Sequence, residues 1–531
     1  MIRWYWPGKI ACFLLLSLFI MTFWALFYFA PLSNNTPIFE DDALWRVIRF
    51  TFYQAFLSTI MSVLPACFIA YSLFRREFYL KSILLNIMSV TIILPSLVVV
   101  FGIISIYGRN GLITNLQELL NLKIGSLNIY GLSGILLAHI FFNLPFACLL
   151  IYRALKAIPA TQRKLAAQLN FTLIDTFRLI EWPFLKKQIF SVSVLIFTLC
   201  FSSFSVVLTL GGGPKTTTIE LAIFQALTYD YDFSRAAYLG LVQIAICMIL
   251  LLISQHFKQE TIKTSSSDWS AISKNKILII IDYSLIFLAC LLILPPLISI
   301  IISGMNPTFW QSLLSMKLLI ALSNSLIIGL IAALLALLLA NLLIWTARQS
   351  LLLKRPIIAN LYISTGSIAL IMPSLIIATG IYLLLFKFKL NHSILSSPYF
   401  LVSLVNGLLA LPFVINLLYP YLTNTAREYH LLCMQNNIKG INRWWIIDFK
   451  ANITHFKKAF AFSLTLSLGD IGVMAFLGTQ SSGNGFLTLP YLLFLQLGSY
   501  QSNQADATAF LLLILVLGLF FLIEKKTQAN N

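Results

Sequence analysis

Charged residues are scarce in this sequence. They account for 10% of its 531 residues and hydrophobic residues for 59%, whereas a soluble domain has about 25% charged and about 45–50% apolar residues. The formal net charge of +18 does not indicate a nucleic-acid partner, because the basic residues lie in short loops between long apolar runs. The composition therefore excludes a soluble globular domain, a disordered chain and a nucleic-acid-binding module. It predicts a membrane protein with many spans.

The sequence also lacks groupings of side chains that bind metals or catalyse reactions. Its 5 His residues are scattered and its 7 Cys residues form no CxxC pair, so we expect no metal site. The glycine-rich stretch 211–216 has Pro214 before Lys215, where a phosphate-binding loop requires Gly. No nucleophile and base stand in a catalytic pattern. We expect no enzymatic activity, no catalytic residue and no cofactor bound by this chain.

Long apolar runs dominate the chain instead. A helix crosses the hydrocarbon core with about 20 residues, and twelve runs are long enough. They are 10–30, 50–74, 81–106, 132–152, 188–210, 236–255, 277–302, 318–345, 357–386, 399–421, 457–478 and 507–523. With the N-terminus in the cytoplasm, about three quarters of the Lys and Arg residues fall in cytoplasmic loops, as is typical of membrane proteins. We predict that both termini are cytoplasmic.

Three short motifs occur twice, in the same order along the chain. The pairs are Leu94-Pro95-Ser96-Leu97 with Met372-Pro373-Ser374-Leu375, Leu144-Pro145-Phe146 with Leu411-Pro412-Phe413, and Gln225-Ala226-Leu227-Thr228-Tyr229 with Gln496-Leu497-Gly498-Ser499-Tyr500. Gly102 and Gly380 follow the two prolines of the first pair at equal distance. Such a series indicates duplication. We predict an all-α integral membrane fold of two parallel six-helix repeats, 1–255 and 277–531, joined by the polar, Ser-rich linker 256–276.

Each predicted repeat contains one long cytoplasmic loop, at about 153–187 and 422–456. Lys164-Leu165-Ala166-Ala167-Gln168-Leu169-Asn170 in the first loop matches Leu431-Leu432-Cys433-Met434-Gln435-Asn436-Asn437 in the second. At the same further distance follow Ile180-Glu181-Trp182-Pro183 and Ile447-Asp448-Phe449-Lys450. The repeated spacing predicts two short helices, joined by a tight bend, in each loop.

These loops resemble the signature of the membrane permeases of bacterial ABC importers, which is Glu-Ala-Ala, three residues, Gly, nine residues and Ile-x-Leu-Pro. The family Glu falls on Lys164 and Leu431, and the family Gly on Asn170 and Asn437. Asn is the residue that best replaces Gly where the backbone is left-handed. The resemblance implies a type I importer fold and a set of residues that couple the permease to its ATPase. That set is Lys164, Ala166, Ala167, Asn170, Ile180, Trp182, Pro183, Leu431, Cys433, Asn437, Ile447 and Phe449.

Within that family, the chain resembles the fused permeases of thiamine and thiamine pyrophosphate importers most closely. The stretches that carry this resemblance include 178–183, 208–214 and 217–227. It implies a bacterial inner-membrane location, contact with membrane lipid, a periplasmic thiamine-binding protein and two copies of a cytoplasmic ABC ATPase, which uses the ATP. Two alternatives remain: an ABC permease for another solute such as ferric iron, and an ion-coupled secondary transporter. The latter would usually place several charged residues in its spans.

Two acidic residues stand within predicted spans. Asp282 lies near the cytoplasmic end of its span, and we expect its carboxylate to snorkel to the membrane surface. Asp470 is deeper and should face protein or a water-filled path, and its counterpart in the first repeat is Ser203. Asp470 either meets a cationic cargo during passage or holds a gate through hydrogen bonds, and we favour the gate.

Overall fold

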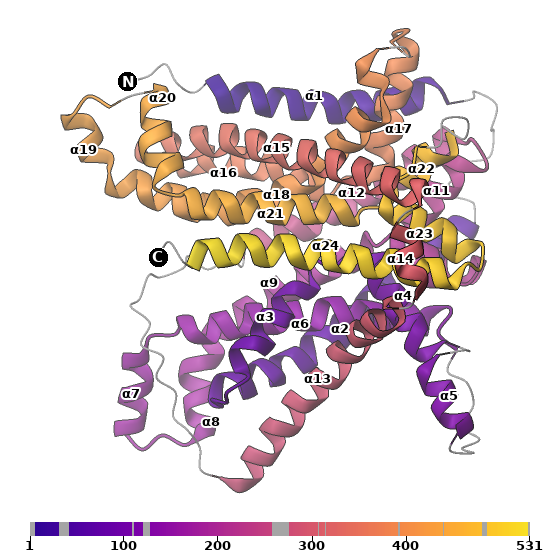
Figure 1. Cartoon of the computed structure of the whole chain (residues 1–531). Coiled ribbons are helices and arrows are strands. Elements are labelled where there is room, and N and C mark those ends of the chain that lie inside the picture. The colour runs from indigo at the N-terminus through magenta and orange to yellow at the C-terminus, as the bar shows by residue number, and fades with distance from the viewer. Residues whose placement is uncertain are drawn as a thin grey trace.

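The computed structural model describes residues 6–30, 42–108, 111–119, 128–256, 275–305, 307–313, 315–390, 393–438, 440–480 and 486–528. Every regular element in these ranges is a helix, so the predicted all-α fold is confirmed. Long helices run side by side, and short ones gather at both ends of the bundle (Figure 1).

The helices follow one another in a similar order in the two halves. The first half contains α1 (Trp6–Tyr28), α2 (Asp42–Arg75), α3 (Lys81–Thr91), α4 (Ser96–Tyr107), α5 (Leu112–Leu119), α6 (Leu132–Ala157), α7 (Ala160–Gln168), α8 (Leu173–Thr176), α9 (Trp182–Phe201), α10 (Ser205–Leu210), α11 (Ile219–Thr228) and α12 (Phe233–His256). The second half contains α13 (Lys276–Gly304), α14 (Pro307–Leu313), α15 (Met316–Leu352), α16 (Pro356–Ser367), α17 (Ser374–Lys387), α18 (Pro398–Glu428), α19 (His430–Gln435), α20 (Gly440–Arg443), α21 (Ile453–Gly469), α22 (Gly472–Gln480), α23 (Leu489–Gly498) and α24 (Ser502–Gln528).

The same hydrogen bond ties corresponding helices together in the two halves. The backbone N–H of Ile219, which begins α11, donates to the hydroxyl of Thr51 in α2 at 3.0 Å. The N–H of Leu489, which begins α23, donates to the hydroxyl of Ser325 in α15 at 2.8 Å. The first N–H groups of a helix have no partner within the helix, so a hydroxyl of the neighbouring long helix satisfies one in each half.

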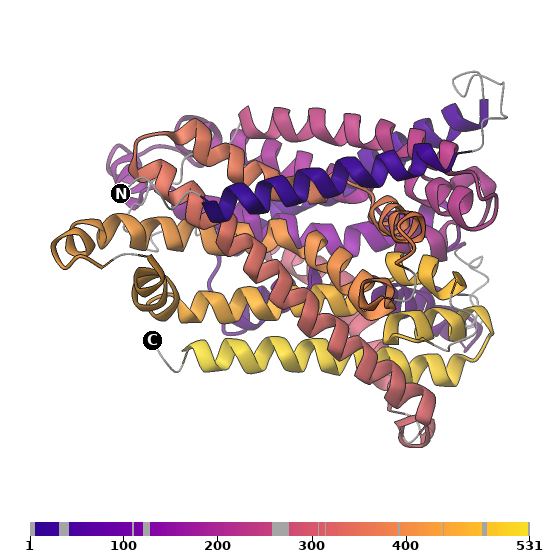
Figure 2. The same ribbon diagram turned by 90° about the horizontal axis from the view of Figure 1, so that it is seen from above.

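The first helix of each half packs against the other half. Helix α1 contacts α15 and α17, and α13 contacts α2 and α4; Figure 2 shows α1 lying across helices of the second half. The repeated glycines permit this approach. A Cβ on Gly102 would lie 2.8 Å from the carbonyl oxygen of Pro296 in α13, and one on Gly380 would lie 2.5 Å from Cβ of Thr22 in α1.

Asp282 of α13 contributes to the contact between α13 and the first half. The expectation that its carboxylate snorkels to the membrane surface is wrong. Its side chain is 0% exposed, and its two oxygens lie 2.6 Å from Arg75, the last residue of α2, and 2.8 Å from Arg76, which follows it. The Ser72 hydroxyl donates a further hydrogen bond at 3.0 Å. Because α13 packs on α2, the carboxylate meets two guanidinium groups inside the protein and has no need of the membrane surface.

Four of the twelve predicted spans are divided into shorter helices in the described structure. The runs 81–106 and 357–386 are interrupted at Pro95 and Pro373, whose backbones are extended and which cannot donate a helical hydrogen bond. The runs 188–210 and 457–478 are interrupted between α9 and α10 and between α21 and α22, the latter with a bend of 43°. Among the described residues, 10 helices are long and apolar enough to cross a membrane, or 11 if the bent pair forms one span.

Candidate functional site

The two loops predicted to couple to an ATPase lie at one end of the bundle. Helices α7 and α8 and helices α19 and α20 project there, at the end where α1 begins and α24 finishes (Figure 1). Helices α11, α22 and α23 gather at the opposite end. The structure therefore places both matched loops on the same side of the protein.

Both loops contain the same left-handed turn. Asn170 has φ 54° and Asn437 has φ 52°, as expected where Asn replaces Gly. The N–H of Phe171 donates to the carbonyl of Ala166 at 3.0 Å, and that of Ile438 donates to the carbonyl of Cys433 at 2.9 Å. This is the hydrogen bond that ends a helix with a left-handed residue in the Schellman manner. The asparagines thus set the angle at which the chain leaves α7 and α19.

The predicted coupling residues differ in exposure, in a pattern that largely repeats between the halves. The exposed ones are Lys164, Ala167, Asn170, Trp182, Pro183, Leu431 and Asn437, the half-buried ones are Ile180 and Phe449, and the buried ones are Ala166, Cys433 and Ile447. The equivalent residues Ala166 and Cys433 are each 3% exposed. They fix the short helices to the body of the protein, whereas the exposed set is open to a partner.

Apolar side chains project from matched positions of the two loops. Ile174 in α8 is 76% exposed and its counterpart Ile441 in α20 is 71% exposed. Leu165 and its counterpart Leu432 are 56% and 48% exposed. Exposed apolar patches are typical of surfaces that bind another protein. Each loop therefore offers a surface suited to a partner subunit.

Each loop is tied to the bundle by a buried carboxylate. Glu181 and Asp448 end or lie within π-helical segments, Phe177–Glu181 and Trp444–Lys450, and are 3% and 1% exposed. Glu181 forms an ion pair with Arg163 of α7, with 3.3 Å between Nε and Oε1. It also accepts a hydrogen bond from the hydroxyl of Tyr71 in α2.

Asp448 forms an ion pair with Arg348 of α15. Sequence reasoning missed these basic partners and Tyr71. The sequence did show an acidic residue at the same position of both motifs, and this could have indicated a basic partner in each half.

A cavity of about 360 Å³ lies between the halves. Pro95 and Ser96 of the first half and Met372 and Ser374 of the second line it. Ser203, from the break between α9 and α10, and Asp470, from the break between α21 and α22, line it as well. The structure thus brings both predicted pathway residues into one space.

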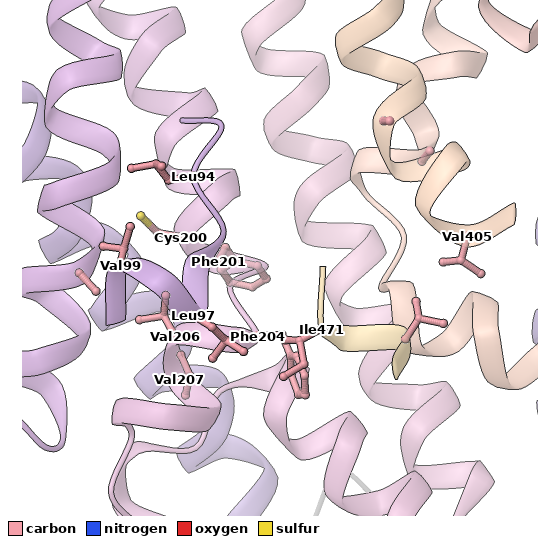
Figure 3. Packing of buried hydrophobic residues seen from close by; sticks show 14 of the residues in the cluster. Leu94, Leu97, Val99, Cys200, Phe201, Phe204, Val206, Val207, Val405 and Ile471 are labelled. Carbon is pink, nitrogen blue, oxygen red and sulfur yellow. The ribbon is translucent and has the colours of Figure 1, made fainter. Parts of the chain in front are cut away.

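The two broken helices meet beside this cavity. Phe204 and Ile471, the residues that follow Ser203 and Asp470, lie close to each other in Figure 3. A Cβ on Gly472 would lie 3.6 Å from the Phe204 ring. These breaks therefore place equivalent residues of the two halves face to face, as expected near an axis that relates parallel repeats.

Asp470 uses one of its two oxygens within the described structure. Oδ1 accepts a hydrogen bond from the N–H of Gly472 at 3.3 Å and so caps α22, whereas Oδ2 has no partner among the described residues. The hydrogen bond to Oδ1 fits a role in stabilising the break between α21 and α22. Oδ2 can still accept a hydrogen bond from another group.

Glu220 is a further acid on the cavity that sequence reasoning missed. It belongs to α11, is 4% exposed, and its Oε1 accepts a hydrogen bond from Gln243 of α12 at 2.7 Å. It escaped notice because it lies outside every predicted span, on a short helix that folds back into the bundle.

The chain is similar to known transport proteins over almost its whole length. Residues 61–261 match the family described as binding-protein-dependent transport system inner membrane component. The thiamine transport system permease protein ThiP of Salmonella typhimurium is 41% identical, over 98% of this chain and 96% of its own. ThiP of Escherichia coli is 41% identical, over 99% and 97%, and ThiP of Brucella abortus is 37% identical, over 92% and 89%.

The fold, the paired loops and these similarities define an inner-membrane permease subunit of a binding-protein-dependent ABC transporter, which is a transport subunit and not an enzyme. More narrowly, the chain belongs to the family of thiamine transport system permease proteins.

Proposed function

We propose that this chain forms the membrane pathway of an ATP-driven importer of thiamine and its phosphate esters, loaded by a periplasmic thiamine-binding protein. Its similarity to thiamine permeases over nearly the full chain supports the cargo. The observation that carries the mechanism is the pair of matched loops at one end of a bundle that encloses a cavity between its halves.

The two loops would each bind one ATPase subunit. Their exposed, equivalent side chains Ile174 and Ile441 present the same kind of surface twice. The chain carries two loops, so two ATPase copies bind per permease. The end that bears the loops then faces the cytoplasm, and so do both termini, because α1 begins and α24 finishes there.

The buried carboxylates of the two loops would transmit movement of the ATPases to the helices around the cavity. When the two ATPases close on ATP, they draw α7 and α19 together. In the first half the hydroxyl of Tyr71 in α2 donates to Glu181 of the loop. In the second half Arg348 of α15 pairs with Asp448 of the loop. The breaks at Pro95, Pro373 and between α21 and α22 let helix segments turn without bending a continuous helix. A switch between inward-open and outward-open arrangements follows.

A reconstituted importer tests this function. Sealed proteoliposomes would contain the permease, its ATPase and internal ATP, with the binding protein outside. We expect uptake of thiamine that needs ATP and binding protein and that persists when ionophores remove all ion gradients. The phosphate esters are tested as separate cargoes.

Uptake that continues with an inactive ATPase and stops with the ionophores would show an ion-coupled transporter instead. Uptake of ferric iron without uptake of any thiamine form would show a different cargo.

A further inference from the structure

The described lining of the central cavity has acidic residues and no basic ones of the Lys or Arg type. The acidic residues are Glu220 and Asp470. His139, the other titratable group in the lining, uses Nδ1 in a hydrogen bond of 2.9 Å with Ser58. Two carboxyl groups without a Lys or Arg beside them favour a positively charged occupant.

Each carboxylate keeps one oxygen unpaired. Oε2 of Glu220 and Oδ2 of Asp470 have no hydrogen-bond partner among the described residues, although both atoms are inaccessible to solvent. Their other oxygens are held by Gln243 and by the backbone of Gly472. Buried polar atoms of folded proteins nearly always have a partner, so the unpaired oxygens indicate a ligand that the cavity receives.

The aromatic residues of the lining favour an organic cation. Phe142, Phe204, Phe413 and Phe462 line the same cavity, and the faces of aromatic rings attract cations. Among the described residues, no three His, Cys, Asp or Glu side chains stand together as a metal site would need. A flat, delocalised cation can lie against a ring and meet a carboxylate at its edge.

We infer that Glu220 and Asp470 form a cation subsite for the positively charged ring of the cargo, with Glu220 as a specificity-determining residue. The inference rests on the function proposed above, since it takes thiamine and its thiazolium ring as the cargo. Glu220 is held for this task by Gln243, and Asp470 comes from the opposite half. The cation thus bridges the two halves while it passes.

The test compares thiamine with a neutral isostere in which a thiophene ring replaces the thiazolium ring. ATP-driven uptake of each is measured in proteoliposomes with saturating binding protein, for wild type, E220Q and E220D. Gln at this position can still accept the hydrogen bond from Gln243, so E220Q removes the charge and keeps the shape. We expect E220Q to lower thiamine uptake at least tenfold and uptake of the isostere less than twofold, and E220D to keep the wild-type ratio.

Other outcomes overturn the inference in distinguishable ways. Equal losses for both compounds in E220Q would show a purely structural role for Glu220. Unchanged uptake of both would show that water satisfies the unpaired oxygens. Failure of the wild type to import thiamine would remove the proposed function itself, and the subsite with it.

Discussion

Arg348 of α15 occupies, in the second half, the place that Phe74 of α2 has in the first. Thr51 and Ser325 accept equivalent hydrogen bonds, so they align α2 with α15. The same alignment matches Tyr71 with Trp345. In the first half, Arg163 of the loop reaches over Phe74, with 4.3 Å from its guanidinium carbon to the ring centre, and pairs with Glu181.

In the second half the guanidinium group comes from the long helix itself. Arg348 stacks on Trp345 at 4.3 Å and pairs with Asp448. The residue at the position of Arg163 is His430. A buried carboxylate needs a cationic partner or several hydrogen-bond donors. The loop supplies that cation in the first half, and the long helix supplies it in the second. The ion pair, and not the identity of the residues that make it, is what the repeats share.

Removing one member of this pair should destabilise the permease. D448N leaves the guanidinium of Arg348 buried without its counter-charge, which costs about 3–5 kcal/mol. The double variant R348M/D448L, which fills the site with apolar groups, should recover most of that loss. Thermal unfolding of the purified permease measures both. A double variant no more stable than D448N would show that the site needs the charges themselves.

Valine in place of the left-handed asparagines should weaken coupling, whereas glycine should not. A residue with a branched side chain pays roughly 1–2 kcal/mol for this backbone conformation, so N170V and N437V would shift the turns that orient α7 and α19. Glycine has no such cost. The readout is ATPase stimulation by the loaded binding protein. Equal stimulation in the Val and Gly variants would contradict the account.

The glycine at the contact between α17 and α1 should not tolerate a methyl group. In G380A the new Cβ would overlap Thr22, at 2.5 Å, and overpacking of this kind costs about 1–3 kcal/mol. Gly498 offers a matched control, because a Cβ there has nothing within 4 Å. Thermal unfolding should rank G498A with the wild type and G380A below it. Two variants of equal stability would mean that the helices can move apart at no cost.

Neutralising the buried Asp282 should cost more stability than neutralising Glu77, an exposed acid that follows Arg76 in the chain. D282N leaves Arg75 and Arg76 without their carboxylate, with an expected loss of about 3–5 kcal/mol. The side chain of Glu77 is 76% exposed, and its partner Lys81, which is 8% exposed, keeps a second hydrogen bond to the carbonyl of Arg76 at 2.9 Å. Water can replace the exposed carboxylate, so we expect E77Q to cost about 1 kcal/mol. E77Q is therefore the control. A D282N variant as stable as E77Q would show that the contact between α13 and α2 does not depend on this charge.

The sequence was sufficient to predict the fold class, the two matched loops and the turns at Asn170 and Asn437. Apolar length predicts helices in a membrane because each helix satisfies its own backbone there. The same criterion could not find the breaks, since it counts hydrophobicity and not hydrogen bonds. Pro95 and Pro373 were visible, but whether a proline kinks a span or divides it depends on neighbouring helices.

The contacts between the halves were beyond sequence reasoning. Asp282 was expected at the membrane surface, because nothing in its own segment shows that Arg75 and Arg76 lie beside it. Glu220 was hidden for a related reason, since it follows a polar stretch between spans. Ser203 and Asp470 could be matched by position, yet their shared cavity follows only from the packing of the two halves.

If each matched loop binds one ATPase, native mass spectrometry of the purified complex will show it. We expect the mass of one permease with two ATPase subunits, and the permease alone after I174E/I441E, since charged groups would then face the apolar docking surface of each subunit. I394E is the control, because Ile394 is 86% exposed and precedes α18 at the end away from α19. A wild-type complex with any other number of ATPases, or an I174E/I441E permease that keeps both, would contradict the account.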